Sequence, residues 1–412
     1  MKIAIINGSP KGKKSTTLQL VQVVQNKFGA YEYAELPVGA SIKALEKDSA
    51  KMDAAIDELK KADVLIWSFP VYVMVVPSQL MRFIELIQMH APKDLLKGKY
   101  ATSISTSLNF FDHTAHTYMR EVSEDFGLRY FEGFSASAME MEKEELQRNL
   151  ASFFGEFFQM SEKRVPVERL SFTISYGSFV YNPKKTIETP KKGSKNILVL
   201  TNAGSDDTNL NRMIDVFVKS TTNKARVVDL NALGIKGGCL GCGECMATAV
   251  CVYKDDFMSF FNETVKPADS IIYAAAIKNR YISSIWKQYF DRNFVNGHRP
   301  ILNGKPMGFL FGGPLRQLPN LREIFTAHME VGKNPFIGFQ TDECGDTEEL
   351  TREIRAFSEK VDRILEKPWI RPATFLGVGG HKIFRDLVYS MRTLMVEDHK
   401  YYTEKGLYDF PE

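Results

Sequence analysis

Residues 1–27 read MKIAIINGSPKGKKSTTLQLVQVVQNK, and this stretch indicates the fold of the first half of the chain. The run IAII at residues 3–6 is continuously apolar, which is typical of a strand that is buried on both faces. A Gly-Ser-Pro turn follows, and a helix-like run then extends from Ser15 to Lys27. A buried strand joined by a glycine turn to a helix predicts the opening of a parallel α/β sheet.

The same arrangement recurs in the second half, offset by roughly 200 residues, a distance that indicates a domain duplication. Both halves continue with a second short strand, a helix and a third strand that begins with an Ala-Asp pair, and each third strand precedes a loop and an amphipathic helix. The alternation predicts two doubly wound parallel sheets flanked by helices. The repeated segments are NILVLT at 196–201 with a helix at 209–219, the third strands from Ala62 and Ala268, and the helices from Ser78 and Ser283.

The repeat also predicts the domain boundaries. Within the connector, residues 170–181 (LSFTISYGSFVY) look strand-like, and the lysine-rich part after them reads as a solvated linker. In the tail, IFRDLVYSMRTLMV has helical spacing of apolar residues, and we expect it to pack on the rest of the chain or to act as a lid. The predicted segments are a first domain at 1–162, a connector at 163–195, a second domain at 196–366 and a C-terminal tail at 367–412.

Composition excludes several classes of function. Hydrophobic residues make up 44% of the 412 residues and charged residues 25%, as in a globular protein. With 53 basic and 50 acidic residues the net charge is only +3, so no nucleic-acid partner is expected. The first apolar run is too short for a signal peptide and no stretch approaches a membrane span. We therefore expect a cytoplasmic protein.

Two segments of the first half carry features of a ligand site at the carboxyl ends of parallel strands. Gly8, Ser9 and Pro10 form a tight turn, and Ser15, Thr16 and Thr17 open the following helix, where amide and hydroxyl donors can meet a phosphate. The alternative is ordinary helix capping by the same residue types. After the third strand comes Pro70-Val71-Tyr72-Val73, which could wall a planar ring, although residues 73–76 could equally be core.

Together these two segments resemble the flavodoxin-like NAD(P)H-dependent FMN reductases, over most of residues 1–160. The shared pattern is Gly-Ser-Pro, then Ser-x-Thr, then Pro-Val-Tyr followed by a Pro-x-x-Leu-x-x-Phe helix, here Pro77 to Phe83. The resemblance implies strand order 2-1-3-4-5, bound FMN and NAD(P)H as the electron donor. It implies these FMN-binding residues: Ser9, Ser15, Thr16 and Thr17 around the phosphate, Pro70, Val71, Tyr72 and Val73 beside the ring, and Thr106 and Ser107 in the loop after the fourth strand, which lacks the usual glycines.

Four of the five cysteines lie within thirteen residues of the second half. Cys239, Cys242, Cys245 and Cys251 have the spacing C-x2-C-x2-C-x5-C, which suits thiolate ligation of a four-iron cluster. Zinc or unligated thiols are the alternatives. Cys344 stands apart and reads as a small buried residue.

Residues 239–257 resemble the compact motif of the iron–sulfur flavoproteins, which places its cysteines between the second strand and the second helix. The resemblance implies a 4Fe-4S cluster in the second half. The second half has meanwhile lost the flavin features: Asp206 and Asp207 would repel a phosphate, and residues 274–280 lack Pro-Val-Tyr. We therefore expect FMN in the first half and a cluster in the second.

These features predict a flavin-dependent oxidoreductase that passes electrons from NAD(P)H or a protein donor through FMN and the cluster to an unidentified acceptor. The expected partners are a small-molecule or protein electron acceptor and a second copy of the chain in a homo-oligomer. No catalytic residue is assigned, because hydride acceptance by a flavin needs no dedicated acid or base, although Tyr72 is a candidate for lining the ring. The alternatives are an electron carrier without its own substrate and a redox sensor. The two domains are expected to pack as an internal pseudo-dimer.

Overall fold

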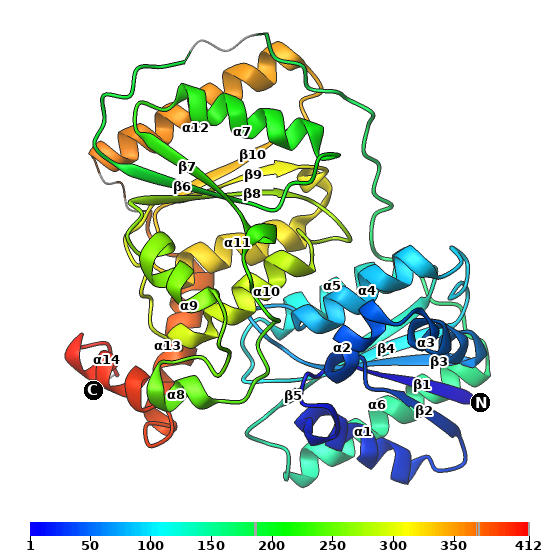
Figure 1. Ribbon diagram of the computed structural model, residues 1–412. Helices are drawn as coiled ribbons and strands as arrows, with labels where there is room; N and C mark the ends of the chain where they lie inside the picture. The colour runs from blue at the N-terminus through cyan, green and yellow to red at the C-terminus, as the bar shows by residue number, and fades with distance from the viewer. Residues whose placement is uncertain (185–187, 368, 370, 411–412) are drawn as a thin grey trace. The chain divides into compact units, whose positions relative to one another are not determined.

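The computed structural model describes residues 1–184, 188–367, 369 and 371–410. The chain forms two compact units, each built around one parallel sheet (Figure 1). Unit 1 contains Met1–Thr173, Gly238–Cys242 and Lys287–Asp291, and unit 2 contains Ile174–Gly237, Gly243–Trp286 and Arg292–Glu412. Because both units draw on separate stretches of the chain, the predicted boundaries at 162, 195 and 366 remain a prediction.

The first sheet has five parallel strands in the order β2-β1-β3-β4-β5. Its central strands pair in register, with Ile3 opposite Val64 and Val64 opposite Tyr100. The strands are β1 (Lys2–Asn7), β2 (Glu32–Leu36), β3 (Val64–Pro70), β4 (Tyr100–Ser107) and β5 (Arg129–Ser137). The helices are α1 (Thr16–Lys27), α2 (Val38–Lys47), α3 (Ser49–Lys61), α4 (Ser78–His90), α5 (Asp112–Asp125) and α6 (Glu144–Glu162).

Burial explains why the opening segment folds as a strand. Ile3, Ala4, Ile5 and Ile6 are all completely buried, because β1 lies inside the sheet with helices on both faces. Helices α1 and α6 cover one face of the sheet (Figure 1). The core on that face includes the buried side chain of Phe154. The continuous apolar run is thus the consequence of a two-sided environment.

The second sheet repeats the topology, with order β7-β6-β8-β9-β10. Helices α7 and α12 cover one face and α11 lies on the other (Figure 1). The strands are β6 (Asn196–Thr201), β7 (Lys224–Asp229), β8 (Ser270–Ala276), β9 (Met307–Gly312) and β10 (Phe336–Thr341). The helices are α7 (Thr208–Ser220), α8 (Glu244–Thr248), α9 (Phe257–Phe260), α10 (Ser284–Arg292), α11 (Pro319–Val331), α12 (Thr347–Glu366), α13 (Phe375–Ser390) and α14 (Val396–Glu404). Two tandem sheets of order 2-1-3-4-5 confirm the predicted fold class.

The strand-like reading of residues 170–181 is wrong. Among the described residues of 165–195 none lies in a strand. The backbone amides there bond to side chains instead of a neighbouring strand: Ser171 N donates to Glu124 Oε2 at 2.8 Å, and Tyr181 N donates to Asn209 Oδ1 at 2.8 Å. These backbone-to-side-chain bonds therefore anchor an extended connector, while Leu170, Phe172 and Val180 are exposed.

The tail is helical, as its apolar spacing predicted, but the helix is broken. Helix α13 ends at Ser390 and α14 starts at Val396, so the predicted stretch from Ile383 to Val396 spans the end of one helix, a turn and the start of the next. Helix α13 packs on α11, where Thr374 N donates to Glu330 Oε2 at 2.8 Å. In the described parts of the chain, no helix combines the length and the apolar character that a membrane crossing requires.

Candidate functional site

The predicted site residues of the first half gather at one edge of the first sheet. Strands β1, β3 and β4 are adjacent and parallel, so the loops that follow them lie at the same edge. This carboxyl edge, next to the position where the strand order reverses, is where open α/β sheets bind ligands. We call residues 8–17 the phosphate loop and residues 70–78 the ring loop.

Side-chain bonds shape the phosphate loop. The fully buried Asn7 ends β1 and accepts the Ser9 amide at 3.1 Å through Oδ1, while its Nδ2 donates to the Gly12 carbonyl at 3.3 Å. Ser9 Oγ accepts the Lys11 amide at 3.3 Å. Ser15 caps α1 by accepting the Leu18 amide at 3.3 Å. The loop is therefore ordered by polar contacts of its own.

These contacts leave the donors that an anion requires. Ser9 and Ser15 are each about 1% exposed, and both hydroxyl oxygens act as acceptors in the bonds above. Each hydroxyl proton can still be donated to a phosphate oxygen. Thr16 and Thr17 open α1, whose first amides and dipole favour a negative charge. The loop thus combines hydroxyl donors with a helix N-terminus.

Two glycines allow the chain to approach closely here. A Cβ at Gly39, on α2, would collide with the carbonyl oxygen of Gly8. A Cβ at Gly8 would lie 2.7 Å from Cδ2 of Leu80 on α4. The turn is therefore held between α2 and α4. Sequence reasoning missed Gly39, although its place after the second strand matches that of the cysteines in the second half.

The ring loop folds back on itself. Tyr72 N donates to the Val75 carbonyl at 2.9 Å and Val75 N donates to the Tyr72 carbonyl at 3.2 Å. The two residues between them have left-handed backbone angles, with φ of 42° for Val73 and 67° for Met74. A β-branched residue in this region is a genuine outlier, and such strain gathers at ligand sites.

Burial divides the ring loop into two parts. Pro70, Val71, Tyr72 and Val73 are partly exposed, whereas residues 74–76 are buried. Thr114 on α5 holds the buried part by donating from Oγ1 to the Met74 carbonyl at 2.6 Å. The residues predicted to border a ring are thus the accessible ones, and the core alternative describes only 74–76.

The end of β4 touches both other loops. Thr106 and Ser107 are the last two residues of this strand, so their predicted place in the loop after the fourth strand is wrong. Thr106 Oγ1 lies 2.6 Å from Thr17 Oγ1, and the Thr106 carbonyl accepts the Val71 amide at 3.0 Å. Ser107 Oγ accepts the Asn109 amide at 3.0 Å. The structure therefore brings Thr106 together with the phosphate loop and the ring loop.

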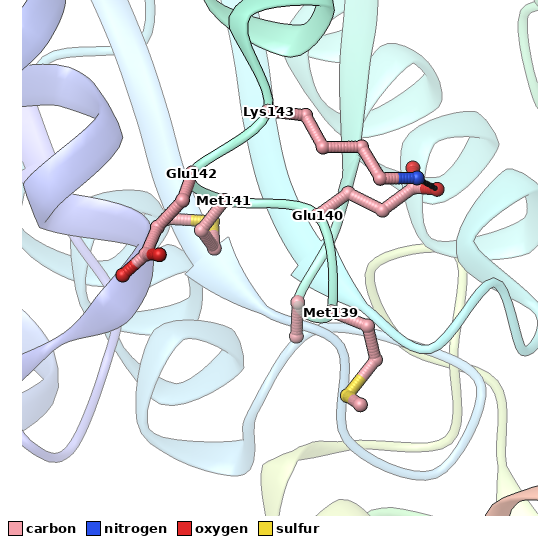
Figure 2. Close-up of a pocket in the computed structure, with 6 residues that line it drawn as sticks. Met139, Glu140, Met141, Glu142 and Lys143 are labelled. Carbon is pink, nitrogen blue, oxygen red and sulfur yellow. Dashed lines mark hydrogen bonds and ion pairs between the residues drawn. The ribbon is translucent and has the colours of Figure 1, made fainter.

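A shallow pocket lies at the same edge, in the loop between β5 and α6 (Figure 2). Its volume is about 350 Å³, and residues 138–143 line it. The loop joins the site through Ala138, whose amide donates to the Ser107 carbonyl at 2.7 Å. Lys143 Nζ and Glu140 Oε1 pair at 2.6 Å across its rim. Nothing in the sequence indicated this pocket except the position of the loop after the fifth strand.

We call residues 239–251 the cysteine segment. Its first residues, up to Cys242, belong to unit 1. Cys239 accepts two hydrogen bonds within unit 1. Gln79 Nε2 donates to its carbonyl at 3.1 Å, and the Gly241 amide donates to its Sγ at 3.3 Å. A Cβ at Gly241 would overlap the phenol oxygen of Tyr72. Burial raises the pKa of Tyr72, and the negative charges of Cys239, Asp291 and Cys242 raise it further. Tyr72 therefore lies against the first turn of the cysteine segment.

The other two cysteines of the segment belong to unit 2. Cys245 Sγ donates to the Phe294 carbonyl at 3.6 Å. Among the described residues no three His, Cys, Asp or Glu side chains are arranged to hold a metal ion. Thiols and an N–H to sulfur bond are the chemistry that an iron–sulfur cluster uses. The predicted metal-binding role of the four cysteines remains a prediction.

In the second half, the loop after β6 corresponds in position to the phosphate loop, and the carboxylate of Asp207 binds within it. Asp207 Oδ2 accepts the Gly204 amide at 2.9 Å and pairs with Lys278 Nζ at 3.5 Å. Asn202 Oδ1 accepts the indole N–H of the buried Trp286 at 2.6 Å. The loop amide that an anion would use is therefore bound within the protein.

A doubly wound sheet with these loops defines a flavodoxin-like protein. Residues 1–124 match the family model of the NADPH-dependent FMN reductases. The iron–sulfur flavoprotein of Archaeoglobus fulgidus is 26% identical over 207 residues, which are 48% of this chain and 93% of that protein. The FMN-dependent NADH:quinone oxidoreductase of Vibrio vulnificus is 30% identical over 113 residues, which are 24% of this chain and 58% of that protein.

Solved structures are similar at low identity. The apo form of the NADH:FMN oxidoreductase EMOB is 22% identical with a TM-score of 0.33, covering 38% of this chain and 87% of that chain. FerB, an NAD(P)H:(acceptor) oxidoreductase of Paracoccus denitrificans, is 20% identical with a TM-score of 0.34. The match covers 39% of this chain and 97% of that chain.

The family match contains both motifs on which the resemblance was predicted, Gly8-Ser9-Pro10 and Pro70-Val71-Tyr72. The resemblance is thereby confirmed for residues 1–124, and the matches support the predicted enzyme class of NAD(P)H-dependent FMN oxidoreductases.

Proposed function

We propose that unit 1 binds one FMN at its carboxyl edge and that the enzyme uses it to pass electrons from NAD(P)H to a small-molecule or protein acceptor. The observation that carries the proposal is the junction at Thr106, which joins the phosphate loop to the ring loop. FMN, when bound, supplies hydride acceptance and one- or two-electron transfer. The rest is done by residues that bind and orient it.

The residues divide by chemistry. Ser9 and Ser15 donate hydroxyl protons to the phosphate, and the first amides of α1 at Thr16 and Thr17 add to them. Pro70, Val71, Tyr72 and Val73 border the ring, because they are the accessible part of the ring loop. The β5–α6 pocket beside Ser107 offers space for an acceptor at the same edge (Figure 2).

The finer proposal is that Cys239, Cys242, Cys245 and Cys251 hold a 4Fe-4S cluster. Their spacing, the Gly241 amide directed at Cys239 Sγ and the likeness to an iron–sulfur flavoprotein support it. A cytoplasmic location belongs to the same proposal, since iron–sulfur ligands must be reduced thiols.

The deciding experiment is anaerobic purification followed by flavin, iron and acid-labile sulfide analysis, and then turnover with NADH or NADPH and a quinone. One FMN per chain with turnover supports the proposed enzyme. Flavin without turnover would favour an electron carrier that has no substrate of its own. Two flavins per chain, or none, would refute the assignment to unit 1 alone.

A further inference from the structure

A buried ion pair from far along the chain contacts the ring loop. Lys287 and Asp291 lie one turn apart on α10, and both belong to unit 1. Their side chains are completely buried and paired with each other. Desolvating two charges costs free energy that the pairing alone seldom recovers. Stability alone therefore does not account for this pair.

The pair binds the two ends of the ring-loop turn. Lys287 Nζ donates to the Tyr72 carbonyl at 2.6 Å. Asp291 Oδ2 accepts the amide of Ser78, the first residue of α4, at 2.8 Å. Tyr72 enters the turn and Ser78 leaves it for the helix. One ion pair thus fixes both ends of the segment.

This segment needs such support because it is strained. Val73 and Met74, between the two fixed ends, have the left-handed backbone angles described above. Residues in such conformations persist only where the surroundings impose them, at a cost on the order of 1–3 kcal/mol each. Thr114 holds the turn at its middle, and the ion pair holds it at its ends.

We propose that Lys287 and Asp291 are positioning residues for the flavin site, which set the ring loop in its binding conformation. Although both residues come from the second half of the sequence, they act on the loop that carries Tyr72. The inference rests on the proposed function, since it takes the ring loop as part of the FMN site.

The test removes both charges together. Burial lowers the pKa of Lys287 and raises the pKa of Asp291, because water no longer solvates their charged forms. A single substitution would leave one charge without its partner, at a large cost in stability. The variant Lys287→Met/Asp291→Leu removes both charges and both bonds to the loop. Replacing a buried pair by apolar side chains of similar size is often tolerated.

Lys99→Met is the matched control. Lys99 Nζ also donates to backbone carbonyls, those of Leu59, Lys60 and Ala62, at 2.6–2.9 Å. It precedes β4 and therefore lies at the opposite edge of the sheet from the ring loop. The control loses the same type of bond away from the proposed site.

We expect FMN to bind the double variant about tenfold more weakly than the wild type, with a changed flavin absorption spectrum. In flavin-free protein, amide hydrogen exchange in residues 71–80 should be faster. Lys99→Met should show neither effect. If the double variant does not fold, Lys287→Met/Asp291→Asn keeps an acceptor for Ser78 and should show the same effects at smaller size.

Two results separate this inference from the proposed function. If the wild type binds FMN and the double variant matches it in affinity, spectrum and exchange, the positioning role is refuted and the FMN site stands. If the wild type binds no FMN, the proposed function fails, and unchanged exchange at residues 71–80 would refute the positioning role as well.

Discussion

The hydroxyl oxygens of Thr17 and Thr106 lie 2.6 Å apart, although 89 residues separate them in the sequence. Thr17 lies in the first turn of α1 and Thr106 near the end of β4, and both are almost completely buried. The Thr106 carbonyl also accepts the Val71 amide. One residue therefore couples the loop proposed for the phosphate to the loop proposed for the ring.

Thr106→Val should weaken FMN binding, because it leaves the Thr17 hydroxyl buried without this partner and loosens the junction. The expected loss is about 1–3 kcal/mol in binding free energy, measured by fluorescence titration of the apoprotein with FMN. Thr102→Val is the control, since Thr102 is buried in the same strand and donates to the Glu132 carbonyl at 2.6 Å. Equal FMN affinities for the two variants would contradict a coupling role for Thr106.

Ser15→Ala should reduce FMN affinity by about 1–3 kcal/mol through the loss of one hydrogen bond to a phosphate, and adding Thr17→Ala should reduce it further. Removing Ser15 also removes the cap of α1, so stability changes must be separated from binding. Asp48→Ala provides that separation, because Asp48 caps α3 through the Lys51 amide. If both cap variants bind FMN as tightly as the wild type, Ser15 is not a phosphate ligand.

Gly39→Ala should disturb the phosphate loop, since the added methyl group collides with the Gly8 carbonyl of the backbone. Overpacking of this kind typically costs about 1–3 kcal/mol of folding free energy, and FMN affinity should fall with it. Gly155→Ala is the matched helical control: the nearest atom to its new Cβ would be Phe28 Cζ at 3.7 Å, an ordinary contact. Urea unfolding and FMN titration of both variants decide the matter. If Gly39→Ala and Gly155→Ala have the same stability and the same FMN affinity, α2 can shift away from Gly8 without measurable cost.

The sequence predicted the elements whose environment is continuous along the chain. The apolar run at Ile3–Ile6 indicated a strand buried on both faces, and the turn at Gly8 indicated a short connection to a helix. The packing of Gly39 on Gly8 and the bonds of Lys287 to Tyr72 could not be predicted, because they join residues that only tertiary structure brings together. Local pattern also failed at 170–181, where alternating residues have no neighbouring strand to pair with.

His116 should make the stability of unit 1 depend on pH. Its ring bonds to Ser103 Oγ at 2.7 Å and to Ser105 Oγ at 2.8 Å, between α5 and β4. Burial lowers its pKa to about 4, against the opposing effect of Asp112. Because an unfolded histidine titrates near 6.5, the unfolded chain binds more protons between these values. The stabilisation, up to about 3 kcal/mol, is present above pH 6.5 and is lost as the pH falls toward 4.

NMR titration of the His116 ring and urea midpoints at several pH values measure this effect. His116→Gln should flatten the pH dependence between about pH 4 and 6.5, since it removes the titrating group while keeping hydrogen-bonding atoms. A ring that titrates near its unfolded value would contradict the assignment.

Cys242→Ser should abolish iron binding while FMN remains. Cys242 belongs to the cysteine segment, and in that proposal its thiolate is one of four cluster ligands, so its loss prevents assembly of a complete cubane. The proposed FMN ligands are other residues, in the phosphate loop and the ring loop.

Cys344→Ser is the control, because Cys344 lies outside the segment and its thiol donates to the Asp346 carbonyl at 3.5 Å. Iron, acid-labile sulfide and flavin are measured on all three proteins, prepared without oxygen. Stoichiometric zinc without sulfide in the wild type would instead identify a zinc site. Simultaneous loss of iron and FMN in Cys242→Ser would show that the cysteine segment supports the ring loop, where Gly241 already lies against Tyr72.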